Sequence, residues 1–218
     1  MICRAILLLI FLIADSQGID SRRLEILRGR KNVEDGKVSW DKKFSSEQYI
    51  FGKDPADSLT KYAELLPEKR LKVLDLAMSE GRNTVFMAKK GHDVTGIDIS
   101  SVAIKKANAL AKENNVSFKA ILSDLMKYEF KENEFDVVLC YYFLERKLIK
   151  KIKKWVKPGG YIIFENFTVN DPIESRKNKD YLLQENELIS LFRNERIIYF
   201  QEMFHTNRKI SSIVVQKK

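Results

Sequence analysis

The sequence predicts an α/β fold, a three-layer sandwich in which helices cover both faces of a mostly parallel sheet of seven strands. Short apolar runs alternate with helical patterns along most of the chain, and this alternation is typical of parallel strands joined by crossover helices. The run at 135–142 is apolar on both faces, as a buried parallel strand should be. The last two runs are joined by a polar turn, which predicts a C-terminal antiparallel hairpin.

Each expected element has a local signal. Pro55 favours the start of a helix at 57–66, and Pro67 ends it. Ser100 or Ser101 can cap the next long helix, whose apolar residues recur at helical spacing and which ends near residue 114. The other expected helices are 83–90, 148–156 and a short one that begins at Asn186 or Glu187 and ends at Phe192. The expected strands are 71–74, 94–97, 116–122, 135–142, 161–165, 197–200 and 210–215.

The chain divides into three stretches by composition. Residues 1–18 resemble a secretory signal peptide, or leader, because Arg4 precedes an apolar run that is followed by small residues. This run is shorter than the ~20 residues that a comfortable membrane span needs. Residues 19–37 are polar and charged and predict a linker. The folded domain is expected at 38–218, and it begins with a loop-like stretch that is rich in aromatic residues, 40–55.

The charge of the chain favours anionic partners without identifying one. Lysine and arginine number 39 against 30 acidic residues, which gives a formal net charge of +9. Lysines solvated on helix faces explain this excess more simply than a nucleic-acid surface does, and no aromatic-and-basic recognition module is appended. Cys3 and Cys140 are poor disulfide partners, and neither histidine has zinc-ligand spacing. We therefore expect no metal site and no nucleic-acid partner.

Three carboxylates follow three successive predicted strands: Asp75, Asp98 and Asp124. The carboxyl ends of parallel strands meet at one edge of a sheet, which predicts a nucleotide-type site there, and Asp98 has the offset from Asp75 of an acid that accepts ribose hydroxyls. The turn at 77–81 consists mostly of small residues, which allow close approach of a ligand, but its single glycine disfavours NAD. Each acid alone is equally explained as a turn or capping residue.

These motifs together resemble one enzyme family. They read Val-Leu-Asp-Leu-Ala-Met-Ser-Glu-Gly-Arg-Asn, Gly-His-Asp-Val-Thr-Gly-Ile-Asp-Ile-Ser, Ser-Asp-Leu and Lys-Pro-Gly-Gly. They resemble the class I S-adenosylmethionine-dependent methyltransferases, which have a Rossmann-like fold, and are most similar to the tellurite-resistance-type branch. The resemblance covers about 38–168, including an aromatic segment at 40–52. It implies transfer of a methyl group from S-adenosylmethionine to a small-molecule nucleophile.

The resemblance also implies roles for individual residues. Asp98 would bind the ribose hydroxyls, and Asp124 would hold the adenine amine. The residues that it implies for cofactor binding are Asp75, Ala77, Ser79, Gly81, Asp98, Ile99, Asp124, Leu125 and Cys140. The polar candidates near the acceptor are Tyr49, Tyr141 and Arg146, whereas Tyr142 is expected to pack in the core or at the rim. Arg82 either orients an anionic group or is a solvated residue at the helix start. No catalytic base is identified, because transfer to an anionic nucleophile depends mainly on proximity and alignment.

Two features leave alternatives open. Ala77-Met78-Ser79 stands where the family has Gly-x-Gly, so the Ser79 side chain would crowd the cofactor if the backbone needs a positive φ. The leader predicts export or membrane anchoring, whereas the cytosolic supply of S-adenosylmethionine predicts a cytoplasmic enzyme. The alternative functions are methylation of a macromolecular acceptor, and a non-catalytic S-adenosylmethionine-binding domain.

Overall fold

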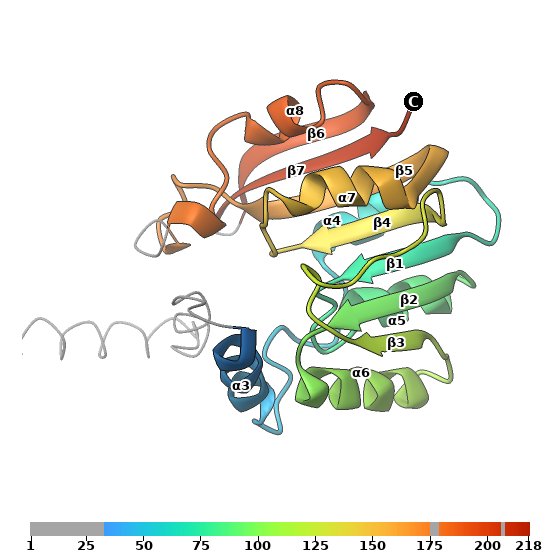
Figure 1. Cartoon of the computed structure of the whole chain (residues 1–218), viewed down its shortest axis with the longest axis vertical. Coiled ribbons are helices and arrows are strands. Elements are labelled where there is room, and N and C mark those ends of the chain that lie inside the picture. The colour runs from blue at the N-terminus through green and yellow to red at the C-terminus, as the bar shows by residue number, and fades with distance from the viewer. Residues whose placement is uncertain (1–32, 175–178, 206–207) are drawn as a thin grey trace, which may run out of the picture.

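The computed structural model describes residues 33–174, 179–205 and 208–218, so the predicted leader at 1–18 lies outside the described residues. The described residues form one sheet with the strand order β3-β2-β1-β4-β5-β7-β6 (Figure 1). The first five strands in this order, from β3 to β5, pair in parallel, and β7 is antiparallel to both β5 and β6. The predicted fold class, including the C-terminal antiparallel hairpin, is therefore confirmed.

The elements follow the order expected from the sequence. The strands are β1 Lys72–Leu76, β2 Asp93–Asp98, β3 Lys119–Leu122, β4 Phe135–Tyr141, β5 Val156–Phe167, β6 Arg196–His205 and β7 Arg208–Gln216. The helices are α3 Val33–Phe44, α4 Asp57–Ala63, α5 Arg82–Lys89, α6 Ser101–Glu113, α7 Leu148–Trp155, α8 Glu187–Leu191 and the 3-10 helix η3 Lys179–Tyr181. Among the described helices, none is long and apolar enough to cross a membrane.

The core lies on both faces of the sheet. On one face, α7 and α8 bury Ile152, Trp155 and Leu188 against the strands. On the other face, α4 and α5 bury Tyr62 and Met87. Alternate residues of the central strands supply both clusters, which explains why their sequences are apolar throughout.

The order of the strands positions a site at the middle of the sheet. β1 lies between β2 and β4, and the chain moves outward on one side to β3 and on the other side to β5. Ligands of open parallel sheets bind beyond the carboxyl ends of the strands at such a reversal. Asp75, near the end of β1, pairs with Gly96 of β2 on one side and with Leu139 of β4 on the other.

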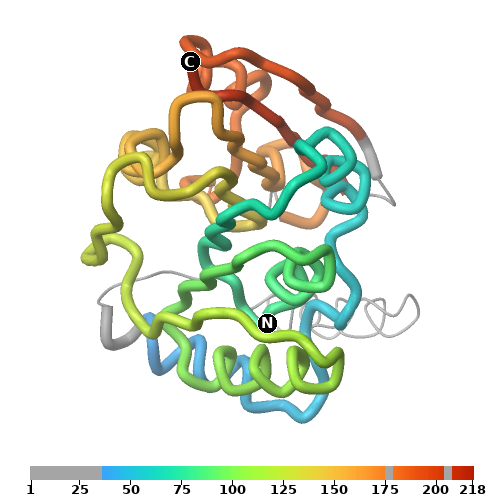
Figure 2. Tube along the Cα trace, turned by 90° about the vertical axis from the view of Figure 1, so that its right-hand side faces the viewer, coloured from blue at the N-terminus to red at the C-terminus, as the bar shows by residue number. Residues whose placement is uncertain are grey.

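Two expectations about the elements around this edge have clear outcomes. Ser100 caps α6, because its Oγ accepts a hydrogen bond from the backbone N–H of Ala103 at 3.1 Å. The expected loop-like start of the domain is wrong for residues 40–44, which belong to α3. Figure 2 shows α3 beside α6 at one end of the molecule and the β6–β7 hairpin at the opposite end. The helix also begins five residues before the expected start of the domain.

α3 is held in place by a side chain rather than by an apolar face alone. The Asp41 carboxylate accepts hydrogen bonds from the Ser100 hydroxyl at 2.7 Å and from the Val102 backbone N–H at 3.2 Å. These donors lie at the N-terminal end of α6, where free N–H groups and the helix dipole favour a negative charge. The contact joins residues far apart in sequence, which is why the helix is difficult to predict from local pattern.

Candidate functional site

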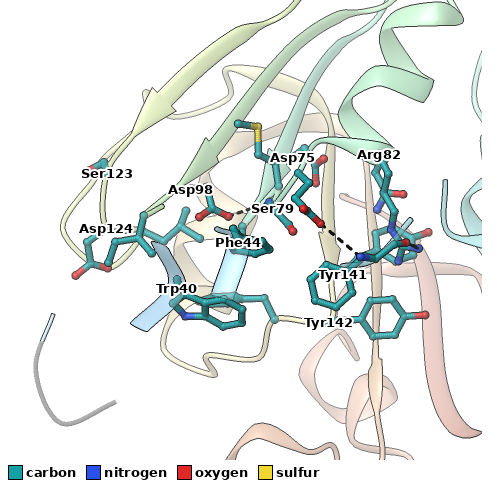
Figure 3. A pocket seen from close by; sticks show the side chains of 18 of the residues that line it. Trp40, Phe44, Asp75, Ser79, Arg82, Asp98, Ser123, Asp124, Tyr141 and Tyr142 are labelled. Atoms are coloured by element: carbon teal, nitrogen blue, oxygen red, sulfur yellow. Dashed lines mark hydrogen bonds between the residues drawn. The ribbon is translucent and has the colours of Figure 1, made fainter. Parts of the chain in front are cut away.

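A pocket opens at the carboxyl ends of the central strands (Figure 3). Its volume is about 910 Å³ when the open mouth is included. Its wall combines the turn after β1, the residues that follow β2 and β3, the tip of β4, and the aromatic segment before α4. The wall joins aromatic and apolar side chains with a few polar groups, as is typical of ligand pockets.

The structure brings the three predicted acids together in this pocket. Asp98 accepts hydrogen bonds from the backbone N–H groups of Ser79 at 2.9 Å and Ser100 at 2.8 Å. Asp124 accepts one from the backbone N–H of Met126 at 2.9 Å. The acids are therefore turn-forming residues and also part of the pocket wall, so the two explanations left open by the sequence are compatible.

Asp75 differs from the other two acids in its burial. Its side chain is 2% exposed, and its Oδ2 atom accepts a hydrogen bond from the Thr84 hydroxyl at 2.6 Å. Burial raises the pKa of Asp75 to about 7, because removal from water penalises the charged form. A ligand that brings an amine or another positive charge to this carboxylate would favour its ionised form.

The turn after β1 keeps a left-handed backbone without the glycines of the family pattern. Ala77 has φ 50°, Ser79 has φ 55° and Gly81 has φ 84°. A left-handed conformation costs a residue with a Cβ about 1 kcal/mol, so Ala77 and Ser79 are strained. The hydrogen bond from the Ser79 backbone to Asp98 helps to hold this conformation. The Ser79 hydroxyl oxygen is buried and has no hydrogen-bond partner in the described part of the chain, which leaves a polar group for a ligand.

Gly81 has a packing role instead of lining the pocket. A Cβ at this position would lie 2.6 Å from the Cβ of Ala107 in α6, well inside van der Waals contact. Gly81 therefore allows α5 and α6 to approach closely while it caps α5. The expectation that it lines the methionine part of the cofactor is corrected, since only its neighbours Glu80 and Arg82 reach the pocket.

Several other predicted residues do line the pocket. Ala77, Ser79, Ile99, Leu125 and Tyr141 all contribute to its wall. Side chains alternate along a strand, so Tyr141 and Cys140 point to opposite faces of the sheet. The Tyr141 ring faces the pocket, as Figure 3 shows, and its hydroxyl accepts a hydrogen bond from Ser58 at 3.4 Å.

Cys140, by contrast, belongs to the core. Its side chain is 1% exposed, packs in the cluster beneath α7, and donates a hydrogen bond from Sγ to the Phe143 carbonyl at 3.2 Å. Burial raises the pKa of the Cys140 thiol well above its usual value. The expectation that Cys140 faces the transferred methyl group is therefore corrected.

Tyr49 and Arg146 also lie outside the pocket wall. The Tyr49 hydroxyl donates a hydrogen bond to the Lys106 carbonyl of α6 at 2.9 Å. The Arg146 guanidinium is bound to the Glu187 carboxylate, and it donates hydrogen bonds to the carbonyls of Asp180 at 2.7 Å and Leu182 at 2.9 Å. Both residues fasten neighbouring segments, and their expected place beside the acceptor is corrected.

Aromatic residues of the N-terminal segment cover the pocket, which the sequence did not predict in detail. Trp40 and Phe44 of α3 stack with their ring centres 5.5 Å apart, and Phe51 meets Phe44 edge-on at 6.3 Å. Tyr142, expected to pack in the core or at the rim, lines the pocket. A cluster of aromatic residues directly before the first strand was the available sequence signal, but their direction depends on how α3 docks.

Glu80 ties this aromatic segment to the sheet. Its carboxylate is buried, forms an ion pair with Lys106, and accepts a hydrogen bond from the Ile50 backbone N–H at 2.7 Å. Lys106 also donates hydrogen bonds to the carbonyls of Ser46 at 2.9 Å and Gln48 at 2.7 Å. The buried pair therefore positions the wall of the pocket. Among the described residues, no group of three or more histidines, cysteines or acids could hold a metal ion.

Comparisons with known proteins agree with this geometry. Residues 73–160 match the family described as "Methyltransferase domain". The chain is 26% identical over 137 residues, 60% of its length and 48% of the relative's, to the probable S-adenosyl-L-methionine-dependent methyltransferase TehB of Haemophilus influenzae. It is 33% identical over 106 residues, 45% of each protein, to the ubiquinone biosynthesis O-methyltransferase of Pseudomonas fluorescens. The chain thus spans about half the length of the curated relatives it matches.

The fold comparison gives the same result. The crystal structure of Haemophilus influenzae TehB superposes with a TM-score of 0.65 at 22% identity and covers 84% of this chain and 67% of that protein. A methyltransferase structure from Methanosarcina mazei superposes with a TM-score of 0.60 at 23% identity, covering 75% of this chain and 98% of that protein. The match at 73–160 and the shared fold therefore support a class I S-adenosylmethionine-dependent methyltransferase, similar in particular to the tellurite-resistance-type branch.

Proposed function

We propose that this chain binds S-adenosylmethionine in the pocket and transfers its methyl group to a small-molecule nucleophile. The observation that carries the proposal is the meeting of three strand-end acids with a left-handed turn in one covered pocket. The match of residues 73–160 to a methyltransferase domain supports the same activity, and the names of the relatives include an O-methyltransferase. The small-molecule acceptor is our own inference from the aromatic residues that line the pocket.

The residues of the pocket fit this cofactor chemically. All four of the following residues line the pocket: Asp98 would accept ribose hydroxyls, Asp124 would accept an adenine amine, and Ile99 and Leu125 would offer apolar surface to the base. Asp75 is buried without an ion-pair partner among the described residues and suits a cationic amine. The unpartnered Ser79 hydroxyl provides a further polar contact. These assignments extend the roles that the family resemblance implies.

When bound, S-adenosylmethionine would supply a sulfonium methyl group. The lone pair of the acceptor would form the new bond to this methyl carbon, and the electron pair of the broken S–C bond would stay on sulfur. Any proton on the acceptor would leave to solvent. Trp40 and Phe44 line the pocket, and their stacked rings would limit the access of water to the reacting groups. The Tyr142 hydroxyl donates a hydrogen bond to Glu165 at 2.6 Å, which fixes the ring as a wall. The protein's contribution is thus mainly proximity and alignment, which suits an acceptor that is already anionic.

Calorimetric titration with S-adenosylhomocysteine tests the cofactor assignment, with NAD as the control ligand. We expect saturable one-to-one binding of S-adenosylhomocysteine and no heat from NAD, because a turn with one glycine does not suit a pyrophosphate. Absence of S-adenosylhomocysteine binding by the folded chain would refute the proposal. Methyl transfer to RNA or protein instead of small molecules, with steep salt dependence, would favour a macromolecular acceptor.

A further inference from the structure

We propose that the methyl acceptor is a small planar monocarboxylate whose carboxylate group binds Arg82. This inference rests on the proposed function, because it concerns the second occupant of the same pocket. Four features of the described residues support it: the charge distribution of the pocket, the partners of Arg82, the number of charges nearby and the shape of the aromatic wall.

The two ends of the pocket carry different charges. Figure 3 shows Asp98 and Asp124 at one end, Arg82 with Tyr141 and Tyr142 at the other, and Asp75 between them. Among the described residues that line the pocket, Arg82 carries the one positive charge. The acidic end suits the hydroxyls and amine of an adenosine group, so the Arg82 end is left for the acceptor.

Arg82 forms no close ion pair with an acid among the described residues, although its charge acts on the buried Asp75 carboxylate. One of its terminal nitrogens donates a hydrogen bond to the Phe51 carbonyl at 3.1 Å. Its guanidinium carbon lies 6.0 Å from the centre of the Phe51 ring and 5.9 Å from that of Tyr142. A guanidinium has five N–H donors and matches a carboxylate with two parallel hydrogen bonds. A half-buried guanidinium between two rings, with donors remaining, is suited to an incoming carboxylate.

The charges near Arg82 favour one negative charge on the acceptor over two. Glu80 also lines the pocket, but Lys106 already pairs with it, so Lys106 is engaged elsewhere. Asp75 lies in the same pocket and would repel an anion when ionised. A phosphate dianion would therefore place two charges against a single cation, whereas a carboxylate is balanced by Arg82 alone. The start of α5 at Arg82 adds the favourable field of a helix N-terminus.

The wall around Arg82 favours a planar acceptor. Tyr142 is held on both sides, because its hydroxyl binds Glu165 and its ring stacks on Phe167 with the centres 4.8 Å apart. Its backbone has φ 57°, an uncommon conformation for a residue with a side chain. The Phe51 ring lies on the other side of the guanidinium. Fixed aromatic faces beside a cation accommodate a flat ring that carries a carboxylate.

The test compares charged and neutral probes of the same shape on the full chain saturated with S-adenosylhomocysteine. The charged probes are benzoate, 4-hydroxybenzoate and 2-mercaptobenzoate, and the neutral probes are the corresponding amides. We expect at least one acid to bind about 10- to 100-fold more tightly than its amide, as one charge-assisted contact predicts. Arg82→Gln should remove this preference, and Arg82→Lys should restore part of it. Arg193→Gln, an exposed arginine far along the chain, is the charge-matched control and should keep the preference.

Each contrary result overturns the proposal in a recognisable way. Equal binding of acids and amides, or binding of neither series, would exclude a carboxylate acceptor. Loss of S-adenosylhomocysteine affinity by more than about tenfold in Arg82→Gln would assign Arg82 to the cofactor's own carboxylate instead. Either result leaves the cofactor assignment intact as long as the unmodified chain binds S-adenosylhomocysteine, so the two proposals fail separately.

Discussion

The two ends of the pocket are built differently. At the acidic end, Asp75, Asp98 and Asp124 each lie at or near the end of a successive strand, so their places follow from chain order alone. At the other end, Arg82 meets Phe51 from the segment before α4 and Tyr142 from beyond β4. The acidic end is therefore a property of the fold, and the Arg82 end depends on how distant segments pack.

The largest expected effect is a loss of cofactor affinity when Asp98, at the acidic end, is replaced. Asp98→Ala removes the proposed ribose acceptor and leaves the backbone N–H groups of Ser79 and Ser100 without their carboxylate. We expect S-adenosylhomocysteine affinity to fall by about 100-fold or more, since hydrogen bonds to a charged group contribute about 1.5–3 kcal/mol each. Calorimetry measures this change, and Asp93→Ala, at the exposed start of the same strand, is the control. Unchanged affinity in Asp98→Ala would refute the ribose assignment.

The acidic end was predictable and the other end was not, for physical reasons. Asp98 and Asp124 follow apolar strands whose period and length are visible in the sequence, and parallel pairing then brings their ends together. The position of Trp40, in contrast, depends on a contact between segments about sixty residues apart. The neighbouring residue, Asp41, binds the N-terminal end of α6 and so orients α3. The position of Cys140 was mistaken because one residue along a strand exchanges the pocket face for the core.

The start of α5, where Gly81 packs against α6, lies between the acidic end and the Arg82 end of the pocket. A substitution there is expected to have the second largest effect, and this effect is on stability. Gly81→Ala places a Cβ 2.6 Å from that of Ala107 at φ 84°, immediately before Arg82. We expect a loss of about 2–4 kcal/mol in the free energy of unfolding, because overpacking adds to backbone strain. Gly91→Ala is the matched control, since its φ is 87° but no atom lies within 4 Å of the added Cβ. Equal losses in urea denaturation would show that packing against α6 is unimportant.

Asp75, between the two ends, predicts a dependence on pH. Its pKa is raised to about 7, so between the unfolded-state pKa near 4 and pH 7 the folded chain holds a proton that the unfolded chain has lost. The contribution of Asp75 to stability is therefore best below pH 4 and declines as the pH rises to 7. Asp75→Asn should become progressively more stable than the unmodified chain over this range, as followed by urea denaturation from pH 5 to 8.

The affinity of the pocket for its ligand should rise with pH, whereas the contribution of Asp75 to stability falls. If the ionised carboxylate holds the cofactor's ammonium group, the affinity for S-adenosylhomocysteine should rise as the pH increases through 7, and Asp75→Asn should lose that rise. The Asp93→Ala variant, altered at an exposed carboxylate, should keep it. An affinity that is independent of pH in both the unmodified chain and Asp75→Asn would remove Asp75 from the cofactor site.

The smallest effect is expected at the turn where the sequence departs from the family pattern. Ser79 has φ 55°, so Ser79→Gly removes strain that the Cβ imposes, and we expect a gain of up to about 1 kcal/mol in the free energy of unfolding. Ala88→Gly, in the last turn of α5, should instead lose up to about 1 kcal/mol, because glycine is unfavourable within a helix. The affinity for S-adenosylhomocysteine then decides the role of the serine. A tighter complex in Ser79→Gly would mean that the side chain crowds the ligand, whereas a weaker one would mean that the buried hydroxyl binds it.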